Sequence, residues 1–305
     1  MKVVVSQDNT GAVRRVPMGL ASRQALIAYI FLFPAFIYFT VFFFVPIVIE
    51  FWSSLHSDDT GNAFVWFDNY VKAFEDQRSI NSFVLTLVFA ISVTILSMVF
   101  GLFLALLLNQ SFRGRTILRT ILLIPYMTSA VIVGLMWRNI LDPLVGILNK
   151  VLIAVGLPTQ DWLSNYKEAL WALVGITVWQ AMGYNMVLFL AGLQGIPTLY
   201  QEAAKIDGAN AWGRFRHITI PLLAPTTLFV SIISVISSLQ AFAQAFIITN
   251  GGPAESTRFY VFHVFNVAFS EGKFAYASAL TFLMFLAILV LTFIQLRVNR
   301  NGVEY

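Results

Sequence analysis

Hydroxyl and amide side chains recur along two long apolar stretches of this sequence, and they are the residues that could do chemistry. In the stretch 218–254 they fall within an arc of about 160° when the residues are projected onto a helix. These residues are Ser234, Ser237, Ser238, Gln240 and Gln244. In the stretch 169–201, Thr177, Gln180 and Tyr184 share one helical face.

The chemistry that such a set favours is reversible binding of a neutral solute. Hydroxyl and amide groups donate and accept hydrogen bonds without carrying charge, and tyrosine adds an aromatic face, so a carbohydrate fits them well. A phosphorylated solute would favour a nearby cation, and neither polar stripe contains one. The stripes could instead serve only to pack against a neighbouring helix.

Sequence patterns for catalysis and for metal binding are missing. The chain has no GxxxxGK segment followed by Ser or Thr to hold ATP phosphates, no GxSxG segment and no HExxH segment. It has no cysteine, and its histidines, His56, His217 and His263, are too scattered to place two ligands on one helical turn. We therefore expect no catalytic residue, no metal site and no cofactor in this chain.

The elements that must position the polar stripes belong in a lipid bilayer. Of the 305 residues, 58% are hydrophobic and 11% are charged, against roughly 25% charged in soluble domains. The mean hydropathy is +0.78. Although the isoelectric point is near 9.4, the basic residues form short clusters beside apolar stretches, which does not favour nucleic-acid binding.

Six charge-free runs are about long enough to cross a membrane as helices, for which roughly 20 residues are needed. They are residues 25–49, 79–112, 120–137, 169–201, 218–254 and 274–296. Turn-forming residues at 249–253 are expected to end the fifth helix near Ile248. The weaker stretch 144–157 contains Lys150 and is predicted to be an interfacial or re-entrant helix. The expected fold is an all-α integral membrane protein with six transmembrane helices.

Lysine and arginine set the expected orientation, because cytoplasmic loops retain positive charge during insertion. In the six-helix arrangement, 12 of the 19 lysines and arginines lie on the side that holds both termini. Both termini should therefore be cytoplasmic. The predicted organisation is a tail at 1–24, a membrane domain at 25–300 with a cytoplasmic loop at 195–221, and a tail at 301–305.

The cytoplasmic loop is predicted to form two short helices with a turn between them. Residues 201–206 are good helix formers, Gly208 can adopt the left-handed conformation that ends a helix, and residues 209–217 can begin a second helix. Small side chains, among them Ala203, Ala204 and Ala209, would let another surface approach the backbone closely. The pattern alone is also compatible with a solvated loop.

The loop resembles the EAA signature of permeases of binding-protein-dependent ABC importers. It reads EAAKIDG from Glu202 to Gly208, and Pro221 and Pro225 follow at the expected spacing. LIPY at 123–126 and NGGP at 250–253 are typical of the sugar-type, maltose-importer-like members. The resemblance extends over roughly residues 26–298.

This resemblance implies a type I ABC importer permease in the cytoplasmic (inner) membrane. The loop would form a coupling helix in a cleft of a cytoplasmic ABC ATPase dimer, which binds ATP and Mg. Its implied coupling residues are Glu202, Ala203, Ala204, Asp207, Gly208 and Ala209, with Gly208 as the turn and Glu202 as a polar contact or helix cap. Tyr184, Ser234 and Ser238 lie at places that contact sugar in the family.

The implied partners are a second, homologous permease subunit and an extracytoplasmic solute-binding protein that delivers the carbohydrate. The alternatives are a permease for another polar solute, such as a glycerol phosphate derivative, and a stand-alone secondary carrier. A secondary carrier usually has an ionisable residue deep in a span, and none is present in these runs. An integral membrane enzyme would need an assembled nucleophile, acid or metal cluster.

Overall fold

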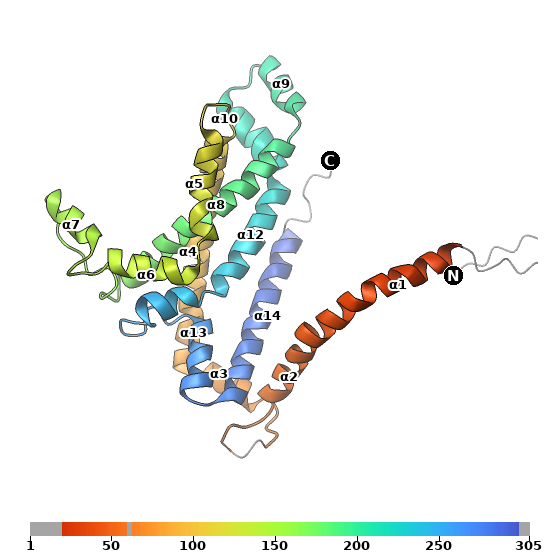
Figure 1. Cartoon of the computed structure of the whole chain (residues 1–305), viewed down its shortest axis with the longest axis vertical. Helices are drawn as coiled ribbons and strands as arrows, with labels where there is room; N and C mark the ends of the chain where they lie inside the picture. The colour runs from red at the N-terminus through yellow and green to blue at the C-terminus, as the bar shows by residue number, and fades with distance from the viewer. Residues whose placement is uncertain (1–19, 60–62, 299–305) are drawn as a thin grey trace, which may run out of the picture. The chain divides into compact units, whose positions relative to one another are not determined.

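The computed structural model describes residues 20–59 and 63–298, and this part of the chain is helical apart from turns, connections and one isolated bridge between His56 and Phe64 (Figure 1). The chain divides into two compact units, Met1–Trp52 and Ser53–Tyr305. The predicted tail at 301–305 and residues 1–19 of the predicted tail at 1–24 lie outside the described residues.

The first unit contains one long apolar helical segment. It is built from α1 (Leu20–Phe39), the π-helical turn η1 (Thr40–Phe44) and the start of α2 (Val45–Ser54). The part Ile27–Ser54 has 28 residues, enough to cross a bilayer. The helix therefore begins before the predicted span 25–49 and continues beyond it.

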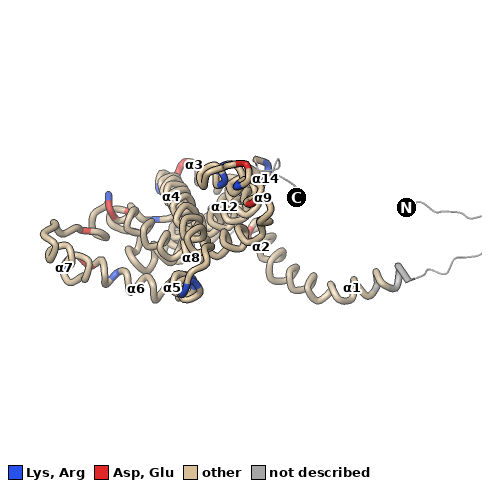
Figure 2. The backbone as a smooth tube through the Cα atoms, turned by 90° about the horizontal axis from the view of Figure 1, so that it is seen from above, with Lys and Arg blue, Asp and Glu red and all other residues tan. Residues whose placement is uncertain are grey.

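In the second unit, four long helices follow the second, fourth, fifth and sixth predicted spans. They are α4 (Gln77–Leu108), α8 (Ala169–Gly195), α12 (Ala224–Leu239) and α14 (Phe274–Val298). After a break, α12 is followed by the π-helix η3 (Gln244–Thr249), so helical structure ends one residue beyond Ile248. The helices α8 and α12 contain no charged residue, and Figure 2 shows most of the helical tube in tan.

Glycines allow these helices to approach one another closely. A side chain at Gly101 of α4 would collide with Asn185 of α8, and one at Gly192 of α8 would collide with Thr226 of α12. Small residues serve this purpose in membranes, where helices associate through close packing rather than through the hydrophobic effect. The most extensive helix contact of the unit accordingly joins α4 and α8.

The third predicted span is not one straight helix. The run 120–137 is divided between α5 (Arg115–Met127) and α6 (Ala130–Ile140), which meet at 94°. Pro125 lacks the N–H for an intrahelical hydrogen bond, and Thr128 is extended (φ −80°, ψ 141°). The described residues thus contain five helices long enough to cross, or six if this bent pair is one crossing.

Short helices connect these elements. They are α3 (Asp68–Glu75), α7 (Ile147–Ala154), α13 (Tyr260–Phe265) and the π-helical turn η4 (Asn266–Ser270). With eight residues, α7 is about 12 Å long and cannot cross a bilayer, as predicted for the stretch 144–157. Asn149 fixes α7 by donating to the carbonyl oxygens of Pro143 and Gln160 at 3.0 and 2.9 Å.

The predicted cytoplasmic loop forms α9 (Thr198–Ile206), α10 (Ala211–Arg214), the π-helical turn η2 (Phe215–Thr219) and α11 (Ile220–Leu222). The charge-free run 169–201 ends as a helix at Gly195, six residues early. The reason is Pro197, because a residue before proline avoids helical geometry and Ile196 is extended. We call α9, the turn 207–210 and α10 the elbow.

Candidate functional site

A cavity of about 200 Å³, the central cavity, lies among α4, α5, α8 and α12. Seven of the eight residues predicted for the solute path line it, namely Thr177, Gln180, Tyr184, Ser234, Ser237, Ser238 and Gln244. Every lining residue is uncharged. The two polar stripes found in the sequence therefore face the same space.

The eighth predicted residue, Gln240, is not part of this lining. It is exposed and follows Leu239, the last residue of α12. Helical structure is interrupted between Leu239 and Gln244, so a projection that assumes one regular helix misplaces Gln240. Gln244 reaches the cavity from the start of η3.

An aromatic pair forms part of the lining and includes a residue that the sequence reasoning did not select. Tyr126 of α5 stacks on Tyr184 of α8 with ring centroids 4.3 Å apart and planes 7° apart. Tyr126 follows Pro125, one residue before the end of α5. The LIPY motif at 123–126 was the available signal for this position.

Asn185 connects three helices beside the cavity. Its side chain is 2% exposed, and its Nδ2 donates to Ser97 Oγ of α4 at 3.0 Å and to Ser234 Oγ of α12 at 3.4 Å. Nearby, Thr177 Oγ1 is buried and has no hydrogen-bond partner within the described chain. Because a buried hydroxyl without a partner is unfavourable, Thr177 is the lining group with the clearest capacity for a ligand hydrogen bond.

The elbow contains the left-handed glycine that the sequence predicted. Gly208 has a φ of +79°. Its N–H donates to the Lys205 carbonyl at 3.1 Å, and the Ala209 N–H donates to the Ala204 carbonyl at 2.9 Å. This pair of bonds is the Schellman arrangement that closes a helix end, and it turns the chain away from α9.

The second helix of the elbow begins at Ala211 rather than at Ala209. Asn210 caps it, since its Oδ1 accepts from the Gly213 N–H at 2.7 Å. The Arg214 guanidinium donates to the Ala209 carbonyl at 2.6 Å, across the turn. From α10 the chain runs through η2 and α11 into α12, so the elbow leads directly to the helix that carries Ser234.

The predicted elbow residues lie largely on the surface. Glu202, Ala203, Asp207 and Gly208 are exposed, and Ala204 and Ala209 are half-buried. Glu202 does not cap a helix, because the N-cap of α9 is Pro197 and Glu202 lies in the helix body.

Large apolar side chains on the elbow are also exposed, and the sequence reasoning did not select them. The exposed fraction is 70% for Leu199, 86% for Ile206 and 66% for Trp212. Large exposed apolar side chains are typical of surfaces that bind a partner. The signal in the sequence was the presence of these residues among the small alanines.

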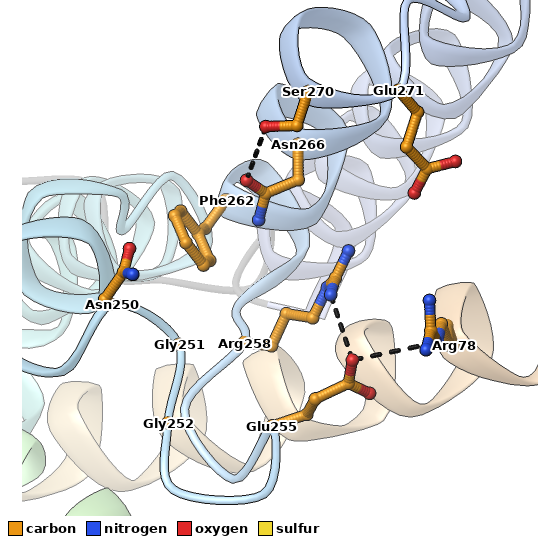
Figure 3. Close-up of a pocket in the computed structure, with 10 residues that line it drawn as sticks. All are labelled: Arg78, Asn250, Gly251, Gly252, Glu255, Arg258, Phe262, Asn266, Ser270 and Glu271. Carbon is orange, nitrogen blue, oxygen red and sulfur yellow. Dashed lines mark hydrogen bonds and ion pairs between the residues drawn. The ribbon is translucent and has the colours of Figure 1, made fainter.

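A second cavity, of about 360 Å³, differs from the central cavity in being charged, and we call it the loop cavity (Figure 3). Glu255 lies between two cations, 3.7 Å from Arg78 Nε and 3.0 Å from Arg258 Nη1. Arg78 belongs to α4, whereas Glu255 and Arg258 belong to the connection after η3. These ion pairs join that connection to the start of α4.

Burial and nearby charged groups shift the pKa values of two ionisable residues near the loop cavity. Burial, with the charge of Arg258 beside it, lowers the pKa of His263 to about 4. The imidazole is therefore neutral at pH 7 and accepts a hydrogen bond from Arg258 Nε at 3.2 Å. A hydrogen bond from Lys273 lowers the pKa of Glu271. Within residues 20–59 and 63–298, no group of three or more His, Asp or Glu residues could hold a metal ion.

Comparison with known proteins agrees with this architecture. Residues 97–301 match the family described as binding-protein-dependent transport system inner membrane component. The chain is 35% identical to the probable ABC transporter permease YesP of Bacillus subtilis, with 93% of each chain covered. It is 33% identical to the trehalose/maltose transport system permease MalF of Thermococcus litoralis, with 92% of this chain and 96% of that chain covered.

A further relative and a solved structure are also similar to this chain. The chain is 30% identical to the sn-glycerol-3-phosphate transport system permease UgpA of Agrobacterium fabrum, with 92% of this chain and 97% of that chain covered. A crystal structure of a bacterial ABC transporter involved in the import of alginate superposes with a TM-score of 0.82 at 21% identity, over 93% of this chain and 98% of that chain. This last likeness concerns the fold alone. By its family match and its relatives, the chain belongs to the inner-membrane permease components of binding-protein-dependent ABC transport systems.

Proposed function

We propose that this chain is a pathway-forming permease subunit of an ATP-driven importer for a sugar or oligosaccharide. It pairs with a second, homologous permease, docks on a cytoplasmic ABC ATPase dimer that binds ATP and Mg, and receives solute from an external binding protein. The bent pair α5 and α6 provides the third of six crossings, and both termini are cytoplasmic. The chain itself hydrolyses no ATP.

The choice of a neutral sugar as the solute is based on the uncharged lining of the central cavity. Gln180, Ser237 and Gln244 offer donors and acceptors in the lining, and Thr177 offers a buried hydroxyl without a partner. The faces and edges of Tyr126 and Tyr184 suit the apolar face of a sugar ring. The relative named for trehalose and maltose transport has 33% identity over nearly the whole chain.

In this proposal the elbow transmits movement of the ATPase to the central cavity. The exposed Leu199, Ile206 and Trp212 would be covered by the ATPase, with Glu202, Ala203, Ala204, Asp207, Gly208 and Ala209 forming the close contact. Gln201 Nε2 donates to Thr219 Oγ1 at 3.2 Å, which ties α9 to η2. Since η2 leads through α11 into α12, displacement of the elbow would shift Ser234, Ser237 and Ser238 at the cavity.

A glycerol phosphate derivative is the second candidate solute, because UgpA relatives at about 30% identity carry that name. The lack of positive charge in the central cavity argues against this solute. A phosphate group bound at a site without a cation is poorly stabilised, and the lining of the central cavity contains no lysine, arginine or histidine.

The test is ATPase activity of the reconstituted complex. We expect the purified chain alone to hydrolyse no ATP, and the full complex to be stimulated by its binding protein loaded with a neutral oligosaccharide. Stimulation by a glycerol phosphodiester in place of the sugar would exclude the proposed solute. ATPase activity that is the same with and without this subunit would exclude the importer assignment itself.

A further inference from the structure

A third cavity, of about 900 Å³, borders the first two turns of α8, and we call it the tryptophan cavity. It is lined by Trp137 of α6, Trp162 of the connection before α8, and Trp171 of α8. On α8, Trp171 and Gln180 are nine residues apart, which places them about 180° apart around the helix axis. The tryptophan cavity therefore lies on the face of α8 opposite to the central cavity and outside the proposed solute pathway.

Two buried polar atoms of this cavity have no hydrogen-bond partner within the described residues. They are the donor Trp137 Nε1 and the acceptor Glu168 Oε2. The other carboxyl oxygen of Glu168 accepts from Asn165 Nδ2 at 2.8 Å, so half of this group is already fixed. Since buried polar groups in native proteins are nearly always paired, a ligand with both a donor and an acceptor would satisfy these two atoms.

The remaining lining limits the class of that ligand. Besides the indole rings it contains four leucines, Leu141, Leu148, Leu152 and Leu157, which favour hydrocarbon over a hydroxylated solute. The lining also contains one cation, Lys167, whose Nζ lies 5.6 Å from the centroid of the Tyr166 ring, and one anion, Glu168. Tryptophan is enriched where membrane proteins meet the headgroup region.

We propose that the tryptophan cavity binds one phospholipid with a protonated amino headgroup, such as phosphatidylethanolamine. The ammonium group donates to Glu168 Oε2. The phosphate accepts from Trp137 Nε1 and pairs with Lys167. An acyl chain lies along the leucines of α7 and of the segments that flank it. The charges of the site and of the headgroup are opposite in sign, with Glu168 facing the ammonium group and Lys167 facing the phosphate.

The first experiment compares two lipids that differ in one respect. The importer complex is reconstituted in discs with equal phosphatidylethanolamine and phosphatidylcholine, washed with detergent, and its retained lipid identified by native mass spectrometry. The choline headgroup keeps its positive charge but has no N–H to donate to Glu168. We expect the ethanolamine lipid to be retained about tenfold over the choline lipid, the effect of one charge-assisted hydrogen bond.

Variants assign the preference to this cavity. In Glu168→Gln the oxygen that accepts from Asn165 is retained, but the charge that holds the ammonium is lost, so the tenfold preference should fall to about onefold. Trp137→Phe removes the indole N–H and keeps an aromatic ring, and should weaken retention of the ethanolamine lipid severalfold. Glu75→Gln changes an exposed glutamate of α3 and should leave the preference unchanged.

Several results would overturn the proposal. These are equal retention of the two lipids by the unaltered complex, a preference that survives Glu168→Gln, or a saccharide or a segment of another subunit found in the cavity. Equal retention of the two lipids by the unaltered complex overturns the proposal even if a variant fails to assemble.

Discussion

Gln240 and Gln244 lie one helical turn apart in the sequence, yet only Gln244 lines the central cavity. We predict that Gln244→Ala raises the KM for sugar uptake by about 2- to 10-fold, the effect of losing one hydrogen bond to the solute. Gln240→Ala should leave KM unchanged, because its side chain lies outside the lining. Uptake of labelled sugar into proteoliposomes measures both. Equal effects of the two substitutions would contradict the proposed pathway.

Gly208 provides a second prediction at the residue scale, and Gly156 is its matched control. Both end a helix, with φ of +79° and +78°, and a Cβ at either would meet no atom within 4 Å. Alanine at each should cost about 1–2 kcal/mol of local stability, because a left-handed conformation strains a residue with a Cβ.

Transport per ATP hydrolysed in the reconstituted complex distinguishes the two glycines. Gly208→Ala should lower this ratio, because it changes the elbow that is proposed to meet the ATPase. Gly156→Ala, which changes the end of α7, should not. Full transport by a Gly208→Pro variant, in which proline fixes φ near −65°, would remove the coupling role of the elbow.

Periodicity was sufficient to predict which polar residues of α8 and α12 face a common space, because helix geometry fixes their spacing. It could not predict Tyr126, which lies on another helix and reaches Tyr184 only through the packing of α5 on α8. Nor could it predict that Asn185 bonds to Ser97, 88 residues away. Asn210 is different, since the preference of asparagine for N-caps was available as a signal.

At the scale of elements, Gly183 of α8 determines how closely α5 can pack. A Cβ at this position would collide with the backbone carbonyl of Leu122. We predict that Gly183→Ala destabilises the chain by about 1–3 kcal/mol through overpacking. Gly195→Ala, at the end of the same helix with no atom within 4 Å of the added Cβ, should be neutral or stabilising by up to about 1 kcal/mol. Thermal unfolding of the assembled complex compares the two, and an equal loss would refute the packing argument.

The lengths of charge-free runs predicted where the long helices lie but not where they break. Pro125 stands inside an apolar run, and composition does not register the 94° bend after Met127. In the same way, the length of the run 169–201 does not indicate that α8 ends at Gly195, although Pro197 is a local signal for this end. The position at which a helix bends or ends depends on the backbone conformation of one or two residues, whereas hydropathy is an average over many residues.

The membrane topology of the whole molecule can be determined with single introduced cysteines. Because the chain has no cysteine of its own, no other thiol reacts with the label. Single substitutions Leu144→Cys and Ile206→Cys each introduce one thiol, at positions with exposed fractions of 90% and 86%. With six crossings and cytoplasmic termini, a membrane-impermeant maleimide should label position 144 in intact cells. It should label position 206 only after the membrane is opened. Labelling of position 206 from outside would exclude the proposed orientation and the importer assignment with it.

The bend between α5 and α6 has a mechanical consequence for the solute pathway. Thr128 (ψ 141°) and Ser129 (ψ 133°) both lie outside helical geometry, so the two arms meet at a joint without helical hydrogen bonds across it. One arm is anchored on α8 and the other on η3. If those two anchors shift relative to each other, the angle between α5 and α6 at this joint must change. Tyr126 belongs to the arm anchored on α8 and would stay stacked on Tyr184, so the movement would fall on α6.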